Sequence, residues 1–179
     1  MEMGLTVSEL RLKHDMERQL GFIVNDPNML DSDGLTPLML VNIFYNNPIN
    51  YTKLLIKMGA DPNIINQEYG TALHAAVTPI PHYESTKYLL SVGANPFIKD
   101  GDGETPYDLA VYYGWDEIAE LLKDHMIRKI QNKQLRRMTR RRARTMKRLA
   151  TAKSMLNENN LMSHMDYDTM SYLMSKYLM

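Results

Sequence analysis

Apolar residues recur at helical spacing in three stretches of the chain, and each stretch contains a pair of adjacent leucines. These leucines are Leu54 and Leu55, Leu89 and Leu90, and Leu121 and Leu122. The first two stretches end at Gly59 and Gly93, and glycine suits the left-handed residue that often follows a helix. The pattern therefore predicts short amphipathic helices whose leucines form one apolar stripe, buried where neighbouring helices stack.

Polar residues between these helices recur as well. The segments Asp26-Pro27-Asn28, Asp61-Pro62-Asn63 and Asn95-Pro96 lie 35 and 34 residues apart, and each begins ten residues before a threonine. The threonines, Thr36, Thr71 and Thr105, can cap a helix, and Pro37 and Pro106 suit its first turn. Asp33-Gly34 and Asp102-Gly103 supply the residues that a tight turn needs.

A period near 33 residues that carries T-P-L-H-x-A resembles the ankyrin repeat, a β-turn followed by two helices. The resemblance covers about residues 22–124 and implies an all-α solenoid with short β-hairpin tips, its repeats at about 31–65, 66–98 and 99–124. It also implies a scaffold that binds a protein partner on its tips and inner helices. On this pattern the tips carry Asp33, Glu68, Tyr69, Asp100 and Asp102, and the inner helices present Leu40, Ile43, Thr78, Leu109 and Tyr112.

Departures from the repeat predict local differences. Gly70 lies one residue nearer its threonine than Gly34 or Gly103 does, so we expect a distorted second tip. The segments NIFYNNPIN in the first repeat and TPIPHY in the second predict a longer loop between the two helices of each repeat. The motif histidine occurs once, as His74, and the resemblance implies that it bonds to the backbone at a helix start. No acid or nucleophile is spaced to make it a catalytic base.

The N-terminal segment predicts half a repeat that caps the stack over residues 5–30. Thr6 and Glu9 fit a capping box, and Gly21 ends the segment. After the capping box, apolar residues follow at helical spacing: Leu12, Met16, Leu20 and Ile23.

Composition excludes several kinds of chemistry. The 179 residues include no cysteine, which rules out disulfides and cysteine-ligated metal sites. The five histidines show no metal-ligand spacing, and no glycine-rich phosphate loop is present. We therefore expect no enzyme, no cofactor and no metal. The charged N-terminus and the lack of a long apolar run predict an intracellular protein, in the cytoplasm or the nucleus.

Charge divides the chain more sharply than hydropathy does. The net charge is zero, yet residues 1–122 carry −10 and residues 123–153 carry +12. All glycines and prolines lie at or before Gly114, and Met126 occupies the position that matches Gly59 and Gly93. We therefore expect the last repeat helix to begin near Asp116 and to continue to about Met155 as a long basic amphipathic helix.

At 100° per residue, most cations of this helix fall on one arc of about 140°, and Arg128 and Arg142 lie off it. We call this set the basic arc; it contains Lys133, Arg136, Arg137, Arg140, Arg141, Arg144, Lys147 and Arg148. An apolar face lies opposite and is interrupted by Arg142. Heptad positions would include Arg142 and Thr145, which argues against a strong coiled coil.

Several partners suit the basic arc. Its composition is typical of a nuclear-localisation signal or a nucleic-acid patch, and in that case Arg136, Arg137, Arg140, Arg141, Arg144, Lys147 and Arg148 would bind a polyanion. Basic amphipathic helices also bind anionic membranes or acidic proteins. The acidic repeats could be the counterpart, within one chain or in self-association, and a solvated helix needs no partner.

These patterns predict three domains: residues 1–124, the basic extension 125–156 and a Met/Tyr-rich tail 157–179. In the tail, Ser163 and Asp166 fit a second capping box ahead of an apolar docking stripe. The favoured interpretation is a non-enzymatic adaptor whose ankyrin surface holds a protein and whose basic helix holds an anionic partner. The alternative is a nucleic-acid or anionic-surface binder in which helix 128–153 is the main functional element.

Overall fold

The computed structural model describes residues 4–21 and 24–158, the last seven as backbone only, together with residues 168, 171, 172 and 175. The described residues form seven helices, α1 (Val7–Leu20), α2 (Pro37–Phe44), α3 (Ile49–Lys57), α4 (Ala72–Ala75), α5 (Tyr83–Ser91), α6 (Pro106–Tyr112) and α7 (Asp116–Glu158). The chain divides into two compact units, residues 1–127 and 128–179. Among the described residues, no helix is long and apolar enough to cross a membrane.

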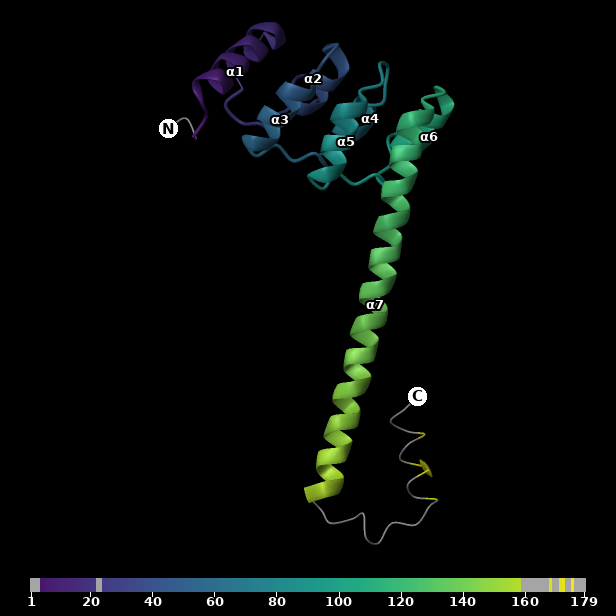
Figure 1. The fold of residues 1–179 in the computed structure, drawn as a ribbon. Helices are drawn as coiled ribbons and strands as arrows, with labels where there is room; N and C mark the ends of the chain where they lie inside the picture. The colour runs from purple at the N-terminus through teal and green to yellow at the C-terminus, as the bar shows by residue number, and fades with distance from the viewer. Residues whose placement is uncertain (1–3, 22–23, 159–167, 169–170, 173–174, 176–179) are drawn as a thin grey trace. The chain divides into compact units, whose positions relative to one another are not determined.

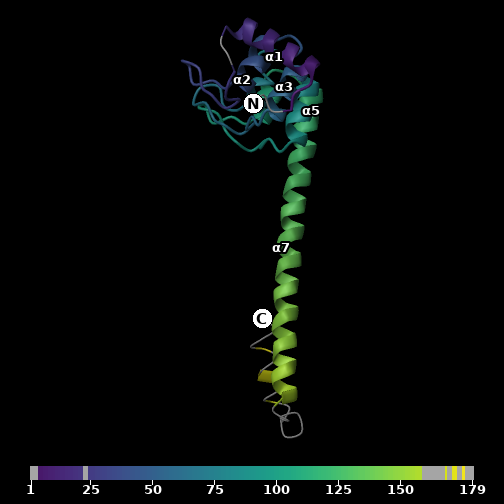
Figure 2. The same ribbon diagram turned by 90° about the vertical axis from the view of Figure 1, so that its left-hand side faces the viewer.

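The first unit is a stack of two helical layers. Helices α2, α4 and α6 pack side by side in one layer, and α1, α3 and α5 do so in the other (Figure 1). Contacts of α2 with α3, and of α4 with α5, join the layers into helical pairs. The loops that precede the inner helices α2, α4 and α6 lie on one side of the stack (Figure 2). This is the all-α repeat architecture that the sequence predicts.

The predicted leucine stripe forms the core of the stack. Leu54, Leu55, Leu89, Leu90 and Leu122 are buried, and Leu121 is half-buried against them. The predicted caps are present as well. The hydroxyl of Thr36 accepts the N–H of Met39 at 3.2 Å, and Pro37 opens α2 at the position where a missing N–H costs nothing.

The ends of α3 and α5 also follow the prediction. Gly59 and Gly93 have φ angles of 98° and 102°, values that residues with a Cβ rarely adopt. The second inner helix is much shorter than the first, because Pro79 and Pro81 follow α4 and cannot continue its hydrogen bonding. This shortening gives the second repeat the long connection that TPIPHY predicts. In the first repeat, where NIFYNNPIN predicts a longer loop as well, only residues 45–48 separate α2 from α3.

Two asparagines hold successive repeats in register. The side-chain amide of Asn28 donates to the carbonyl oxygen of Gly59 at 3.1 Å, and its oxygen accepts the N–H of Asp61 at 2.7 Å. Asn63 makes the same two bonds one repeat later, with Gly93 at 3.5 Å and Asn95 at 2.7 Å. At the third position the chain has Phe97. An asparagine at position 97 would have to bond to a Gly-Ala turn at residues 126 and 127. Helix α7 continues through these residues, so that turn is not formed.

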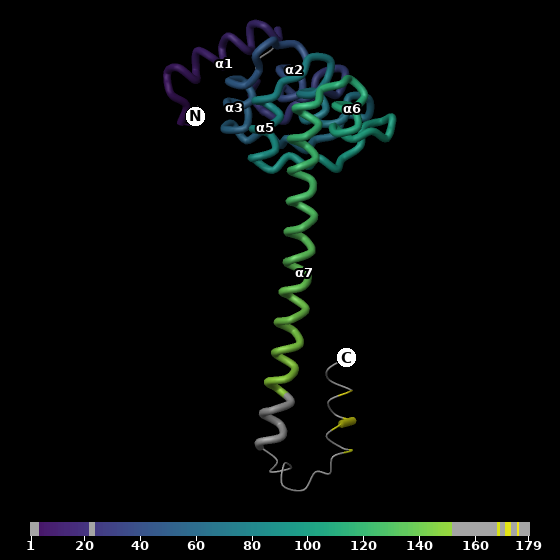
Figure 3. Tube along the Cα trace, turned by 45° about the vertical axis from the view of Figure 1, so that its right-hand side comes forward, coloured from purple at the N-terminus to yellow at the C-terminus, as the bar shows by residue number. Residues whose placement is uncertain are grey.

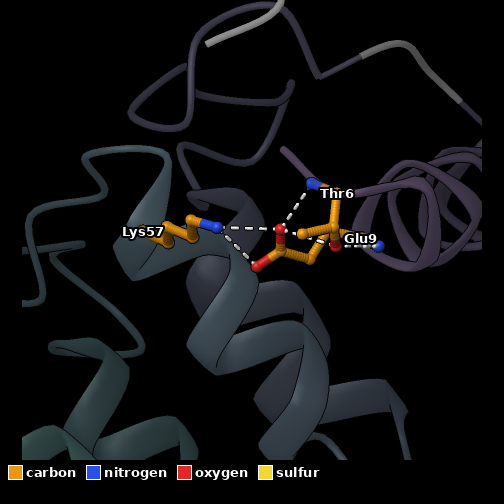
Figure 4. Close-up of polar contacts among 3 residues, drawn as sticks. All are labelled: Thr6, Glu9 and Lys57. Carbon is orange, nitrogen blue, oxygen red and sulfur yellow. Dashed lines mark hydrogen bonds and ion pairs between the residues drawn. The ribbon is translucent and has the colours of Figure 1, made fainter. Parts of the chain in front are cut away.

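The N-terminal helix α1 packs against α3 and caps the N-terminal end of the stack. The N–H of Thr6 donates to Glu9 at 2.7 Å, and the N–H of Glu9 donates to the hydroxyl of Thr6 at 3.3 Å, so the predicted capping box is formed. The Lys57 ammonium on α3 donates to both carboxylate oxygens of Glu9, at 2.7 and 2.8 Å (Figure 4). Met16 is fully buried, and its carbonyl oxygen accepts the Tyr45 hydroxyl at 3.3 Å.

Helix α7 runs without a break from the stack into the second unit (Figure 3). Ile118, Ala119 and Leu122 anchor its first turns in the core. The missing glycine at Met126 predicted this continuation, and the helix ends at Glu158 rather than near Met155. The tail's capping box, Ser163 and Asp166, lies outside the described residues. So does every residue of its apolar stripe, namely Tyr167, Met170, Leu173, Met174, Tyr177 and Leu178.

Candidate functional site

Three five-residue turns form the tips of the stack: 31–35, 66–70 and 100–104. The first and third have the same design. The carboxylate of Asp31 accepts the N–H groups of Asp33 at 3.0 Å and Leu35 at 2.8 Å. Asp100 does the same for Asp102 at 3.1 Å and Glu104 at 2.9 Å. Asp100 is half-buried and holds the turn, whereas Asp102 is the exposed carboxylate of the third tip.

The second tip departs from this design, as the position of Gly70 predicts. The side-chain oxygen of Asn66 accepts the N–H groups of Glu68 at 2.8 Å and Tyr69 at 2.9 Å. Asn66 and Gly70 form an isolated antiparallel bridge, and the left-handed residue is the fifth of the turn instead of the fourth. As a result, Glu68 and Tyr69 stand at the exposed end of this tip, and the Tyr69 side chain is 45% exposed.

Contacts between the tips fix their spacing. The side-chain amide of Asn66 donates to the carbonyl oxygen of Asp33 at 2.8 Å. A Cβ added to Gly101 would lie 2.1 Å from the backbone oxygen of Gln67, so the third tip approaches the second as closely as glycine allows. Glu68, Tyr69 and Asp102 therefore belong to neighbouring tips.

The motif histidine lies beneath these tips and is structural. The N–H of Thr71 donates to Nδ1 of His74 at 3.0 Å, so Nδ1 is an acceptor. Nε2 then carries the proton and donates to the carbonyl oxygen of Glu104 at 3.2 Å. Burial of the ring lowers the pKa of His74. The backbone contacts that the family resemblance implies for this residue are confirmed.

The structure divides the predicted inner-helix set. Leu40 is only 5% exposed and packs in the core, so its assignment to the recognition surface is wrong. Ile43, Thr78 and Leu109 are half-buried. Tyr112 is 77% exposed, yet it is the last residue of α6, about 10 Å of helix away from the third tip. It does not join the cluster of Glu68, Tyr69 and Asp102.

Exposed apolar side chains at the ends of the inner helices form a feature that our sequence analysis missed. Phe44 at the end of α2 is 69% exposed, and Tyr113 after α6 is 47% exposed and packs edge-on against Tyr112. Phe44 and Tyr113 each lie eight residues after a capping threonine, Thr36 or Thr105. That shared offset was the available signal.

The second unit presents the basic arc. Its predicted polyanion-binding members, Arg136, Arg137, Arg140, Arg141, Arg144, Lys147 and Arg148, all have exposed side chains. None of the seven forms an ion pair with another residue that the structure describes. No carboxylate occurs in the sequence between Asp124 and Glu158. As far as the described residues extend, the arc is thus a strip of positive charge with no carboxylate paired to it.

Comparison with known proteins agrees with the helical stack and its tips. A family model described as ankyrin repeats in three copies matches residues 10–100 and 41–136. The chain belongs to the ankyrin repeat family. Ankyrin repeat and SAM domain-containing protein 6 of Rattus norvegicus is 32% identical over 99 residues, 55% of this chain and 11% of that protein. Probable E3 ubiquitin-protein ligase XBOS34 of Oryza sativa subsp. japonica is 42% identical over 84 residues, 45% of this chain and 16% of that protein.

The ankyrin chain thus spans less than a fifth of the length of either relative. Its family resemblance and its all-α fold are both confirmed. Ankyrin repeats indicate a role in protein–protein interaction, and this coarse function holds for the stack.

Proposed function

We propose that the chain is a non-enzymatic adaptor that holds one protein on its ankyrin stack and a second, anionic partner on its basic arc. The protein-binding surface has two parts. The first comprises Glu68, Tyr69 and Asp102 on the neighbouring tips. The second comprises Phe44, Tyr112 and Tyr113 at the ends of the inner helices.

The observation that carries this proposal is the exposure of Tyr112. Large aromatic side chains dominate binding energy at protein interfaces, because they bury much apolar area at little entropic cost. A tyrosine with 77% of its surface in water, beside the exposed Tyr113, therefore supports a docking role. The acidic tips around Tyr69 favour a partner with basic groups near its apolar contacts.

Affinity capture with the full chain tests the protein-binding surface. The double variant Tyr69→Ala, Tyr112→Ala should lose the captured protein while the melting midpoint of the stack stays unchanged. Tyr83→Ala is the matched control, because Tyr83 is an exposed tyrosine on the outer helix α5. We expect Tyr83→Ala to capture the same protein as the native chain. Equal capture by all three proteins would place the binding site elsewhere.

A further inference from the structure

We propose that the basic arc binds the phosphates of double-helical DNA, largely without regard to base sequence. This inference rests on the proposed function in one respect, because it names the class of the second, anionic partner. It stands on the distribution of charge along α7, on the makeup of the face opposite the arc, and on the size of the helix.

The cations of the arc repel one another, and an external polyanion would offset that repulsion. Arg136 and Arg140, Arg140 and Arg144, and Arg144 and Arg148 are like-charged pairs four residues apart, and such pairs destabilise a helix. The sequence from residue 125 to 157 contains no acidic side chain that could separate them. Phosphates aligned along the arc would neutralise these cations together. Most are arginines, whose planar guanidinium matches phosphate geometry with two parallel hydrogen bonds.

The face opposite the arc is too weak for a membrane. Helices that lie in the membrane interface insert Trp, Phe and Leu on one face. Here the large apolar residues on that face include Leu135, Met138 and Met146, and Arg142 lies at its centre. No aromatic residue occurs between positions 116 and 166.

The same interruption disfavours an acidic protein with an apolar groove. Such proteins hold a helix by anchor residues three, four and seven positions apart. The series that starts at Leu135 and Met138 reaches Arg142 at its next position. A partner that recognises charge and ignores the opposite face fits this helix better.

Among nucleic acids, the features favour a DNA duplex. Binding of single strands depends on stacking of bases on aromatic side chains, which this segment lacks. An α-helix about 10–12 Å across fits the major groove of B-DNA, whereas the major groove of an RNA duplex is deep and narrow. From Lys133 to Arg148 the arc is about 22 Å long, which matches six or seven phosphate steps of about 3.4 Å along a strand. The nearby amide side chains, Gln131, Asn132 and Gln134, lie off the arc, so the contacts should be to phosphates and not to base edges.

Titration of the full chain with a short DNA duplex at several salt concentrations tests the proposal. Neutralisation of six or more phosphates should lower the affinity by about 10³-fold or more between about 50 and 200 mM salt. The triple variant Arg140→Glu, Arg141→Glu, Arg144→Glu should lose binding. Its repeats should still melt at the native temperature, and its ankyrin surface should still capture the protein partner.

A matched pair of variants separates the arc from bulk charge. Arg140→Gln and Arg142→Gln remove the same charge two residues apart, but only Arg140 lies on the arc. Arg140→Gln should reduce the slope of log affinity against log salt by about one, and Arg142→Gln should leave it nearly unchanged. Equal effects of the two variants would overturn the proposal. So would the absence of duplex binding at low salt, or tighter binding to the matching single strand, to an RNA duplex, to phosphatidylserine vesicles or to polyglutamate.

Discussion

His74 is the residue whose ionisation bears most directly on the stack. Its Nδ1 must stay unprotonated to accept the Thr71 N–H, and burial lowers its pKa below the ordinary value of 6.5. Below about pH 6.5 the unfolded chain therefore takes up a proton that the folded chain resists. The free energy of unfolding should consequently decrease as the pH is lowered. Burial lowers the pKa of His82 in the same sense.

Denaturant unfolding of the native chain and of His74→Gln between pH 7.5 and 5 checks this prediction. Glutamine can accept the same N–H as the third helical residue of a capping box, and it does not titrate. We expect the native chain to lose stability across this range and His74→Gln to lose less. A variant with the same pH dependence as the native chain would show that His74 does not contribute.

At the scale of elements, the cap helix α1 is joined to α3 by a measurable charge contact. The Lys57 ammonium, followed by the N–H and hydroxyl of Thr6, lowers the pKa of Glu9 from 4.5 to about 2. Lys57→Met should raise the pKa of Glu9, although the bonds from Thr6 will keep it below 4.5. Because the folded pKa is depressed, the stabilisation is present above about pH 4.5 and is lost as the pH falls towards 2.

NMR titration of the Glu9 carboxyl carbon measures this pKa directly. Lys53→Met is the control on the same helix, since Lys53 lies over the ring of Tyr88 and makes no bond to Glu9. The control should leave the Glu9 titration where it is in the native chain. If Lys57→Met does so too, the ion pair is not formed in solution.

The helices and their ends could be predicted because their signals are local. Thr36 caps α2 by accepting the N–H of the residue three positions later. Gly59 follows the end of α3 because it can adopt a positive φ angle. Met126 lacks the conformational freedom of glycine, and α7 continues through it. Exposure depends instead on what packs above a residue from another repeat. For this reason the repeat pattern predicted Leu40 on the surface, although it lies in the core, and it did not predict the exposure of Phe44.

At the scale of the whole molecule, the two proposed binding functions draw on separate residues and should be separable by mutation. Leu89 is fully buried between repeats, and a buried Leu→Ala change typically costs about 2–5 kcal/mol. Since each repeat is stabilised by its neighbours, Leu89→Ala should lower the melting midpoint of the entire stack. The cations of the basic arc belong to the other unit, residues 128–179. At a temperature where the variant remains folded, its affinity for duplex DNA and the salt dependence of that affinity should equal those of the native chain.

Calorimetry measures the melting midpoint of the variant, and a DNA titration of the same preparation measures its affinity. A loss of DNA affinity in the folded variant would show that the stack contributes to the phosphate site, and an unchanged melting midpoint would contradict the role of Leu89 in the core.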